Sequence, residues 1–474
     1  MSDSISDNSI NFSIGDASIG GEKDEEENSI GDDKQDAEPE DDIELDSGKY
    51  EKIGVLTNLN TVVYSELVTK KIDKVKYYND YKVIKKLGEG SICKVKLVEK
   101  NNVKYALKIV NKKQLMKMKK WIPDENGKMV ITTPLDGIVK EISILKKVNH
   151  RNLVKLYEIM NNKKKAKLYL VLEYCENGDL MSYDEVQNKF TVNKNIFKNY
   201  LKNKENSGEI DVDKLYYSEN QIRRFIRQTI RGLNYLHRIG IIHRDIKPNN
   251  ILLDKNNECK IIDFNFSSIL DKHWIDNVGK KVDCNDFFRP PEICDLESDE
   301  LHDYKGAPLD IWAIGVTTFI LSYKKFPFYS ENGDMFELYD KINKAKLEIP
   351  NTPKRSNDFK YFLKKCLERD PNKRITSEKI LDLKWVNLGE KENLKDQCKK
   401  AVKFKLTKEE INKDIDLFWI DYKYIKSFKE DERPVIKEFA NKLLEKIPNV
   451  KDERKIKIKI KPKKNKKGKK DEDK

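Results

Sequence analysis

The stretch Ile241–Leu253 constrains this chain more than any other, because two short apolar runs enclose the polar sequence His-Arg-Asp-Ile-Lys-Pro-Asn-Asn. The pattern predicts a strand, a polar loop and a second strand. The loop presents Asp245, then Lys247 two residues later and Asn250 five residues later. A charged hairpin turn could contain the same residues, but a chance match to so many fixed identities is rare.

The loop resembles the catalytic loop of the protein kinases. The resemblance implies that Asp245 accepts or orients the proton of a substrate hydroxyl. It also implies that Lys247 neutralises charge on the moving phosphoryl group, and that Asn250 holds a Mg²⁺ ion. Lys247 favours the serine/threonine branch, because tyrosine kinases usually have Arg or Ala there. ATP and Mg²⁺ are therefore the expected cofactors.

A glycine-rich segment between two predicted strands agrees with this resemblance. Gly88 and Gly90 allow backbone N–H groups to approach a triphosphate. By resemblance, Lys108 on the next strand reaches the α- and β-phosphates. Cys93 stands where the family has its third glycine, and it is either a small filler, which we favour, or a reactive thiol near ATP. By resemblance, further residues of the nucleotide site are Leu87, Val95, Ala106 and Leu252.

Residues 138–148 have apolar side chains at helical spacing, and this predicted helix contains Glu141. By resemblance, Glu141 pairs with Lys108 and positions it. The alternative is an exposed helix on which Glu141 lies beside neighbouring lysines. We favour the first interpretation, because the neighbouring motifs match as well.

Residues 169–180 predict a buried strand that runs into a polar connector, and this connector resembles the kinase hinge. The resemblance implies that Leu172 gates the back of the adenine pocket. Backbone groups of Glu173 and Cys175 would then bind the adenine edge. Asp179 would hold either the ribose hydroxyls or a basic residue of the substrate.

Asp263 follows a short apolar run and is, by resemblance, the second metal-binding residue, since Mg²⁺ prefers oxygen ligands. Asn265 stands where the family has Gly, a moderate departure because Asn tolerates positive φ. By resemblance, Glu292 pairs with Arg374. The family's Ala-Pro-Glu is changed here to Pro290-Pro291-Glu292.

After Ser268 the chain has no Ser, Thr or Tyr up to Glu292, in the segment where many kinases are activated by phosphorylation. We therefore predict that a fixed carboxylate balances Arg244 and that activity does not need phosphorylation of this loop. The candidate carboxylates are Asp271, Asp276, Asp283 and Asp286.

The motifs predict an α+β, bilobal protein-kinase fold over residues 81–386, with a small β-rich N-lobe and a larger helical C-lobe. The N-lobe is expected at 81–172, the hinge at 173–178 and the C-lobe at 179–386. The other predicted segments are a disordered acidic tail (1–49), an N-terminal extension (50–80), a Lys/Asn-rich surface insert (181–217), a partly helical C-terminal extension (387–450) and a basic disordered tail (451–474).

Residues 1–50 carry 17 acidic and 3 basic side chains, so the net charge of +13 leaves +27 on the remainder. A basic surface can bind nucleic acid. Because Lys and Asn are abundant throughout, we favour compositional drift and do not predict a nucleic-acid partner. The chain has no run of eighteen apolar residues, no secretory signal pattern and no CxxC, so we predict no transmembrane segment and reduced thiols in the cytoplasm. The basic run at 463–470 leaves a nuclear location open.

Within the family the chain is most similar to the calmodulin-dependent protein kinase kinases and related upstream kinases, judged on residues 141–147, 306–317 and 406–411. This resemblance implies a protein substrate, namely a threonine in another kinase's activation loop. Calmodulin binding is not expected, because Asp414, Asp416 and Asp421 interrupt the apolar stretch at 411–428. The alternative function is a catalytically impaired kinase-fold scaffold that binds nucleotide, which the departures at positions 93, 265 and 290 would favour.

Overall fold

The computed structural model describes residues 62–90, 93–123, 129–161, 166–185, 187–197, 214–269, 285–294 and 306–390. The predicted acidic tail, most of the C-terminal extension and the basic tail lie outside these residues. Three of the four carboxylates proposed to balance Arg244 also lie outside them, at positions 271, 276 and 283. The family-level prediction of a β-rich first lobe followed by a helical second lobe is confirmed.

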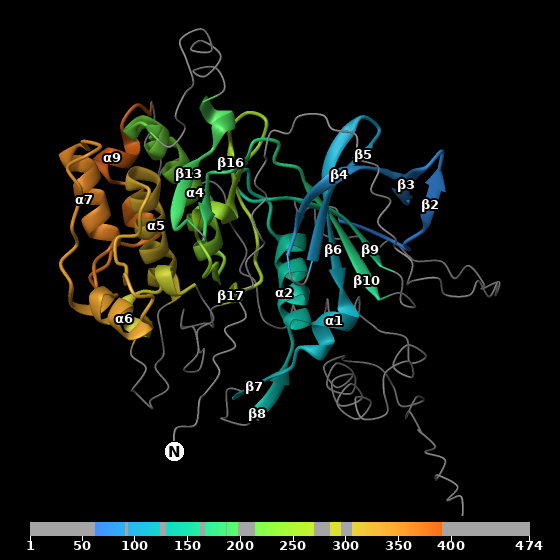
Figure 1. Ribbon diagram of the computed structural model, residues 1–474, viewed down its shortest axis with the longest axis horizontal. Coiled ribbons are helices and arrows are strands. Elements are labelled where there is room, and N and C mark those ends of the chain that lie inside the picture. Colours follow the sequence, from blue (N-terminus) through green and yellow to red (C-terminus); the bar gives the residue numbers. More distant parts are fainter. Residues whose placement is uncertain are drawn as a thin grey trace, which may run out of the picture.

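The first lobe is built on an eight-stranded sheet with the order β1-β9-β10-β6-β5-β4-β3-β2. In Figure 1 the sheet lies on one side of the molecule and most of the helices on the other, with α2 between them. Its strands are β1 (Val63–Ser65), β2 (Thr69–Ile72), β3 (Val75–Tyr78), β4 (Tyr81–Glu89), β5 (Cys93–Lys100), β6 (Val103–Asn111), β9 (Leu156–Asn161) and β10 (Lys167–Glu173).

The N-terminal extension brings the two edges of this sheet toward each other. Strands β1 and β2 lie at opposite ends of the strand order, yet only residues 66–68 separate them in the sequence. That connection spans at most about 14 Å between the Cα atoms of Ser65 and Thr69. The sheet must therefore curve until its two edges approach each other. Its interior holds a separate apolar cluster of Leu67, Tyr78, Tyr81, Val98, Leu107, Ile109, Met160, Tyr169 and Val171.

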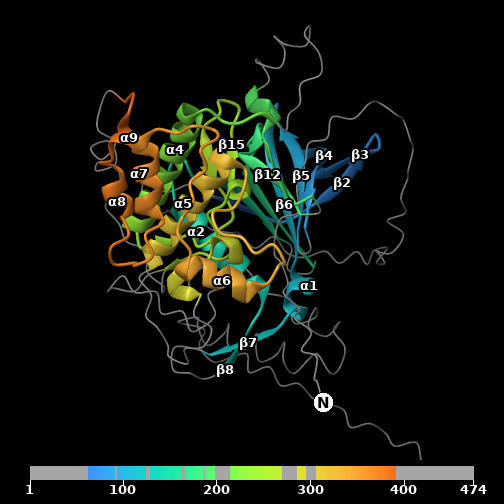
Figure 2. The same cartoon turned by 60° about the vertical axis from the view of Figure 1, so that its left-hand side comes forward.

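The helix α2 (Pro134–Lys147) packs beside the sheet and carries Glu141 on a buried face. It begins with a capping box, in which the backbone N–H of Thr133 donates to Asp136 Oδ2 at 2.7 Å. It follows α1 (Lys112–Lys117) and a small hairpin, β7 (Lys120–Pro123) and β8 (Met129–Thr132), which projects away from both lobes in Figures 1 and 2.

The second lobe is organised around two long helices, α4 (Glu219–Arg238) and α5 (Gly306–Tyr323). The helix α4 begins with a capping box, in which Ser218 and Gln221 bond reciprocally. Nearly every residue of α5 is buried, as its continuous apolar sequence requires. The remaining helices are α6 (Met335–Lys344), α7 (Asn357–Cys366), α8 (Ser377–Ile380) and α9 (Lys384–Asn387).

Short strands carry the polar loops between α4 and α5. They are β14 (Ile241–Ile242), β15 (Ile251–Leu253), β16 (Cys259–Ile261) and β17 (Ser268–Ile269). Strand β15 pairs with β16 and with β11 (Gly178–Asp179), which begins at the last residue of the predicted hinge. The hinge is thereby tied to the loop that precedes β15.

The prediction of a surface insert at 181–217 is wrong for its first part. Strands β12 (Met181–Asp184) and β13 (Lys189–Val192) form a hairpin whose Met181, Phe190 and Val192 are buried in the main core. The ring of Phe190 also contacts that of Phe326, with centroids 5.0 Å apart. The alternation of apolar and polar residues in these short strands was obscured by the surrounding Lys and Asn. Residues 198–213 lie outside the described part.

No helix in the described part of the chain is long and apolar enough to cross a membrane.

Candidate active site

Lys108 and Glu141 form a buried ion pair between β6 and α2. The Nζ atom of Lys108 lies 2.9 Å from Oε1 and 2.8 Å from Oε2 of Glu141, so the predicted pairing is present. The two residues are 4% and 2% exposed. Burial alone would lower the pKa of Lys108, but the carboxylates of Glu141 and Asp263 outweigh it and raise that pKa. Lys108 is therefore a fixed cation at neutral pH.

The predicted catalytic loop brings Asp245, Lys247 and Asn250 together. Asn250 Nδ2 donates to the Asp245 carboxylate at 2.6 Å and to its backbone carbonyl at 2.8 Å. Lys247 Nζ lies 3.1 Å from the same carboxylate. These bonds use the amide nitrogen of Asn250, so its Oδ1 oxygen is the atom left for a cation. The loop thus fixes a carboxylate and an amine within one small polar cluster.

Asp263 lies next to this cluster in the hydrogen-bond network, because the backbone N–H of Ile262 donates to the Asn250 carbonyl at 3.0 Å. Asp263 is 6% exposed and has a φ of 64°. Within the described residues its Oδ1 atom is buried without a hydrogen-bond partner. A buried carboxylate oxygen without a partner is costly unless a cation binds it. Asp263 and Asn250 therefore offer the hard oxygen ligands that Mg²⁺ prefers.

Asp310 was not singled out from the sequence, yet it holds the catalytic loop in place. It is fully buried in α5, and its carboxylate accepts from the backbone N–H groups of His243 at 2.9 Å and Arg244 at 2.7 Å. It also lies 2.8 Å from His237 Nε2. These bonds support Arg244 in its left-handed conformation, with a φ of 66°. An acidic residue within an apolar helix was the available signal, since a buried charge needs partners.

The predicted hinge residues lie where β10 ends and the second lobe begins. Leu172 lies opposite Ala106 of β6, and Asp179 lies opposite Leu252 of β15. All four residues belong to the proposed nucleotide site, and strand pairing places them next to each other two by two. Cys175 is buried, and its carbonyl accepts the Gly178 N–H at 3.2 Å.

The side chain of Glu173 bonds the hinge to two segments, strand β16 and the residue before β9. Its Oε1 atom lies 2.7 Å from Lys260 Nζ of β16, and its Oε2 accepts the Lys155 N–H at 3.3 Å. Its backbone N–H donates to the Lys155 carbonyl at 2.8 Å. The side chains of Lys260 and Glu173 are 9% and 17% exposed. Sequence reasoning assigned only the backbone of Glu173 and missed this pair.

Replacing Lys260 by Met is expected to raise the KM for ATP about fivefold, because losing a partly buried contact worth about 1 kcal/mol loosens the hinge. The Lys255→Met variant removes an exposed lysine from the neighbouring turn and serves as the control. Steady-state kinetics at varied ATP concentration measures the change. An unchanged KM in the Lys260→Met variant would show that the hinge is held without this pair.

The glycine-rich segment forms the turn between β4 and β5. Gly88 pairs with Val95, and the Gly90 N–H donates to the Cys93 carbonyl at 2.9 Å. Leu87 lies at an irregularity in this pairing. Residues 91 and 92 lie outside the described part.

Cys93 packs into the main core, and burial raises the pKa of its thiol. These observations support the small-filler interpretation over the reactive-thiol one. Asn265 is not among the described residues with positive φ, so its replacement of Gly does not require a left-handed backbone.

The predicted pair of Glu292 and Arg374 is confirmed. The two side chains form parallel bonds of 2.6 and 2.7 Å, and the Arg374 side chain is fully buried. Of the four carboxylates proposed for Arg244, only Asp286 lies within the described residues. Its Oδ1 atom lies 3.2 Å from Arg289 and accepts from the Tyr339 hydroxyl at 2.7 Å. That a carboxylate balances Arg244 stays a prediction.

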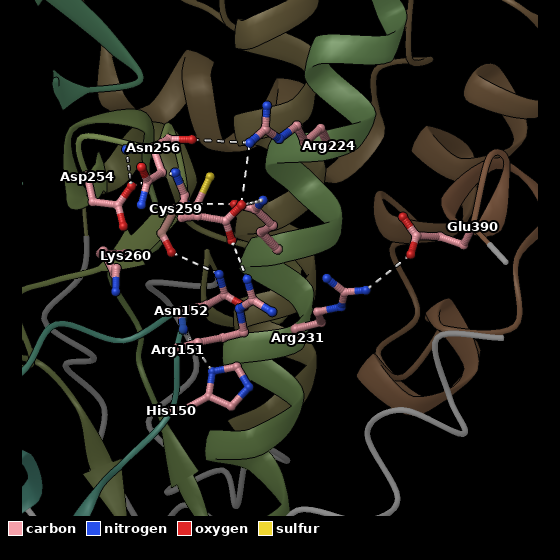
Figure 3. Close-up of polar contacts among 12 residues, drawn as sticks. His150, Arg151, Asn152, Arg224, Arg231, Asp254, Asn256, Cys259, Lys260 and Glu390 are labelled. Carbon is pink, nitrogen blue, oxygen red and sulfur yellow. Dashed lines mark hydrogen bonds and ion pairs between the residues drawn. The ribbon is translucent and has the colours of Figure 1, made fainter. Parts of the chain in front are cut away.

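The loop after α2 is anchored on the second lobe. Figure 3 shows Arg151 and Asn152 near Cys259 of β16, while Arg224 reaches from α4 to the Asn256 carbonyl. Asn152 Nδ2 donates to the Cys259 carbonyl at 3.0 Å, and Arg151 pairs with Glu258 at 3.0 Å. The carboxyl end of α2 is thereby held relative to the strand that leads to Asp263.

Two of the curated relatives resemble this chain at 33% identity over 67% of its length. One is a probable serine/threonine-protein kinase of Dictyostelium discoideum, and the other is the serine/threonine-protein kinase ssp1 of Schizosaccharomyces pombe. The match covers 39% and 44% of these two proteins, so the chain spans about two fifths of their length. The serine/threonine-protein kinase STK11 of Rattus norvegicus is 29% identical over 71% of this chain and 67% of its own.

The family model of the protein kinase domain matches residues 81–386, the same limits that the motifs predicted. The matched range begins at β4 and ends within α9, and it contains the ion pair, the catalytic loop, Asp263 and the buried Glu292–Arg374 pair. Strands β1 to β3 lie before it. On this match and on the geometry of its catalytic loop, the chain belongs to the protein kinase family.

Proposed function

We propose that this chain is an active serine/threonine protein kinase that transfers the γ-phosphate of ATP to protein hydroxyl groups. The observation that carries the proposal is the intact set of polar contacts around two centres, the Lys108–Glu141 pair and the Asp245–Lys247–Asn250 cluster. Protein kinases catalyse mainly by positioning and charge, so intact contacts of this kind are what activity requires.

Each residue is assigned one task. Lys108, held by Glu141, would bind the α- and β-phosphates. Asn250 and Asp263 would hold Mg²⁺, which supplies charge neutralisation at the phosphates when it is bound. Asp245 orients the substrate hydroxyl and receives its proton, and Lys247 stabilises negative charge beside it.

The finer proposal concerns the substrate. The similarity at residues 141–147, 306–317 and 406–411 to the calmodulin-dependent protein kinase kinases supports a threonine in another kinase's activation loop as the acceptor. The absence of Ser, Thr and Tyr between Ser268 and Glu292 supports a kinase that needs no phosphorylation of its own loop. The cytoplasm stays the predicted location, and the nucleus stays open.

The test is transfer of labelled γ-phosphate from Mg·ATP to a generic basic protein, followed by identification of the labelled amino acid. Label on phosphoserine or phosphothreonine is expected. Label on phosphotyrosine would contradict the assignment of Lys247. Nucleotide binding without transfer would instead favour the scaffold, for which Cys93, Asn265 and Pro290 are the departures from the family pattern.

A further inference from the structure

Strand β1 belongs to the eight-stranded sheet but lies before residue 81, where the match to the protein kinase family begins. It pairs in parallel with β9, with Val63 opposite Glu158 and Ser65 opposite Met160. The Ser65 hydroxyl donates to Glu158 Oε1 at 2.5 Å. Asn79 Nδ2 in turn donates to Ser65 Oγ at 3.0 Å. The hydroxyl of Ser65 therefore links the turn between β3 and β4 to β9.

Glu158 is only 7% exposed, and both of its carboxylate oxygens accept hydroxyl donors. The second donor is the hydroxyl of Tyr81 on β4, at 2.8 Å from Oε2. Burial and the bond to Glu158 raise the pKa of Tyr81, so this phenol stays a neutral donor. A buried carboxylate depends on such donors, because losing one leaves a charged oxygen unsatisfied. The contact between Ser65 and Glu158 is therefore sensitive to a negative charge introduced at position 65, because such a charge would replace a donor by a group that repels the carboxylate.

The same strand contacts the helix that carries Glu141. The ring of Tyr64 lies 5.2 Å from Lys146 Nζ in the last turn of α2. Val62, directly before the strand, packs against the main core. Strand β1 is thus connected at one side to β9 and at the other to the last turn of α2.

We propose that residues 62–65 form a positioning strap that holds α2 where Glu141 meets Lys108, and that the Ser65–Glu158 bond fastens this strap. The inference rests on the proposed kinase function for its effect on activity. The loop after α2 is already anchored on the second lobe through Asn152. The strap supports α2 from the sheet of the first lobe, so releasing it frees the helix to shift and weakens the Lys108–Glu141 pair.

The Ser65→Asp variant tests the strap. The new carboxylate faces Glu158, so the strap should detach through like-charge repulsion. We expect kcat to fall roughly tenfold, which corresponds to about 1.4 kcal/mol. The KM for the protein substrate should not change, because the strap does not touch the catalytic loop. Hydrogen exchange of amides in residues 134–147 should accelerate, while exchange in the buried α5 should stay slow.

Two matched variants separate the strap from a general effect of charge. Thr69→Asp adds the same charge to the exposed strand β2 and should behave like the wild type. Adding Glu158→Gln to the Ser65→Asp chain should restore both kcat and slow exchange. The amide can donate to the carboxylate at position 65 and still accept from Tyr81.

The proposal is overturned if the Ser65→Asp chain matches the wild type in kcat and in exchange of residues 134–147. It is also overturned if Glu158→Gln restores neither. Should the Ser65→Asp chain fail to fold, the Ser65→Ala chain is judged by the same two readouts, with a loss of roughly threefold expected for one hydrogen bond. If the wild type transfers no phosphate, the proposed function fails, and the exchange comparison alone decides the strap.

Discussion

Replacing Lys108 by Met is expected to reduce kcat/KM for phosphoryl transfer at least a hundredfold, roughly the loss seen when one preorganised hydrogen-bond donor is removed from a site. It should also lower the free energy of unfolding by about 3–5 kcal/mol, because Glu141 would remain buried without its partner. Steady-state kinetics and urea denaturation measure the two effects. The Lys104→Met variant, on an exposed position of the same strand, is the control and should change neither.

A double variant separates the two roles of Lys108. Adding Glu141→Leu to Lys108→Met removes the unpaired carboxylate, so most of the lost stability should return. Transfer should not return, because no cation is left to bind the phosphates. Recovery of transfer in the double variant would mean that Lys108 only holds α2 and does not contact the nucleotide.

Replacing Arg374 by Met is expected to have the second large effect, again about 3–5 kcal/mol on the free energy of unfolding. The Arg374 side chain is fully buried and makes two bonds to Glu292 of 2.6 and 2.7 Å. It also donates to the backbone carbonyls of Glu368 at 2.7 Å and Pro308 at 2.9 Å. Its loss would leave a carboxylate and several carbonyls without their donor.

Arg374 is tested, like Lys108, with one control at an exposed neighbouring lysine and one double variant that also removes the unpaired carboxylate. Lys373→Met changes the adjacent residue, whose side chain is 77% exposed, and should leave stability within about 0.5 kcal/mol. Adding Glu292→Leu to Arg374→Met removes the unpaired carboxylate and should recover part of the stability. A fully stable Arg374→Met chain would show that the pair is not structural.

The catalytic loop, the Lys108–Glu141 pair and the Glu292–Arg374 pair could be predicted from the sequence because each belongs to a motif with fixed residue identities. The capping box at Ser218 could be predicted because its partners are three residues apart. The pairing of β1 with β9 could not be predicted, since Ser65 and Glu158 are 93 residues apart and the three residues of β1 show no clear period. The pair of Lys260 and Glu173 was missed for the same reason.

The role of Asp310 could be predicted from the sequence only in part. Its acidic side chain within an apolar helix signalled a need for partners, but only the fold shows that these are backbone N–H groups of the catalytic loop. The hairpin at 181–192 was misjudged because its buried residues alternate with polar ones in a Lys- and Asn-rich context. Long-range partners and short strands both depend on tertiary packing, which local patterns do not contain.

The measurement that tests the central claim most directly is phosphoryl transfer from Mg·ATP by the full chain and by its Asp245→Asn variant. Removing this base should lower kcat about 10²- to 10⁴-fold and leave nucleotide binding intact. The Asp340→Asn variant, which changes an exposed carboxylate on α6, should transfer phosphate at the wild-type rate. Equal transfer by the wild type and the Asp245→Asn chain would contradict the assignment of Asp245 and, with it, the proposed catalytic site.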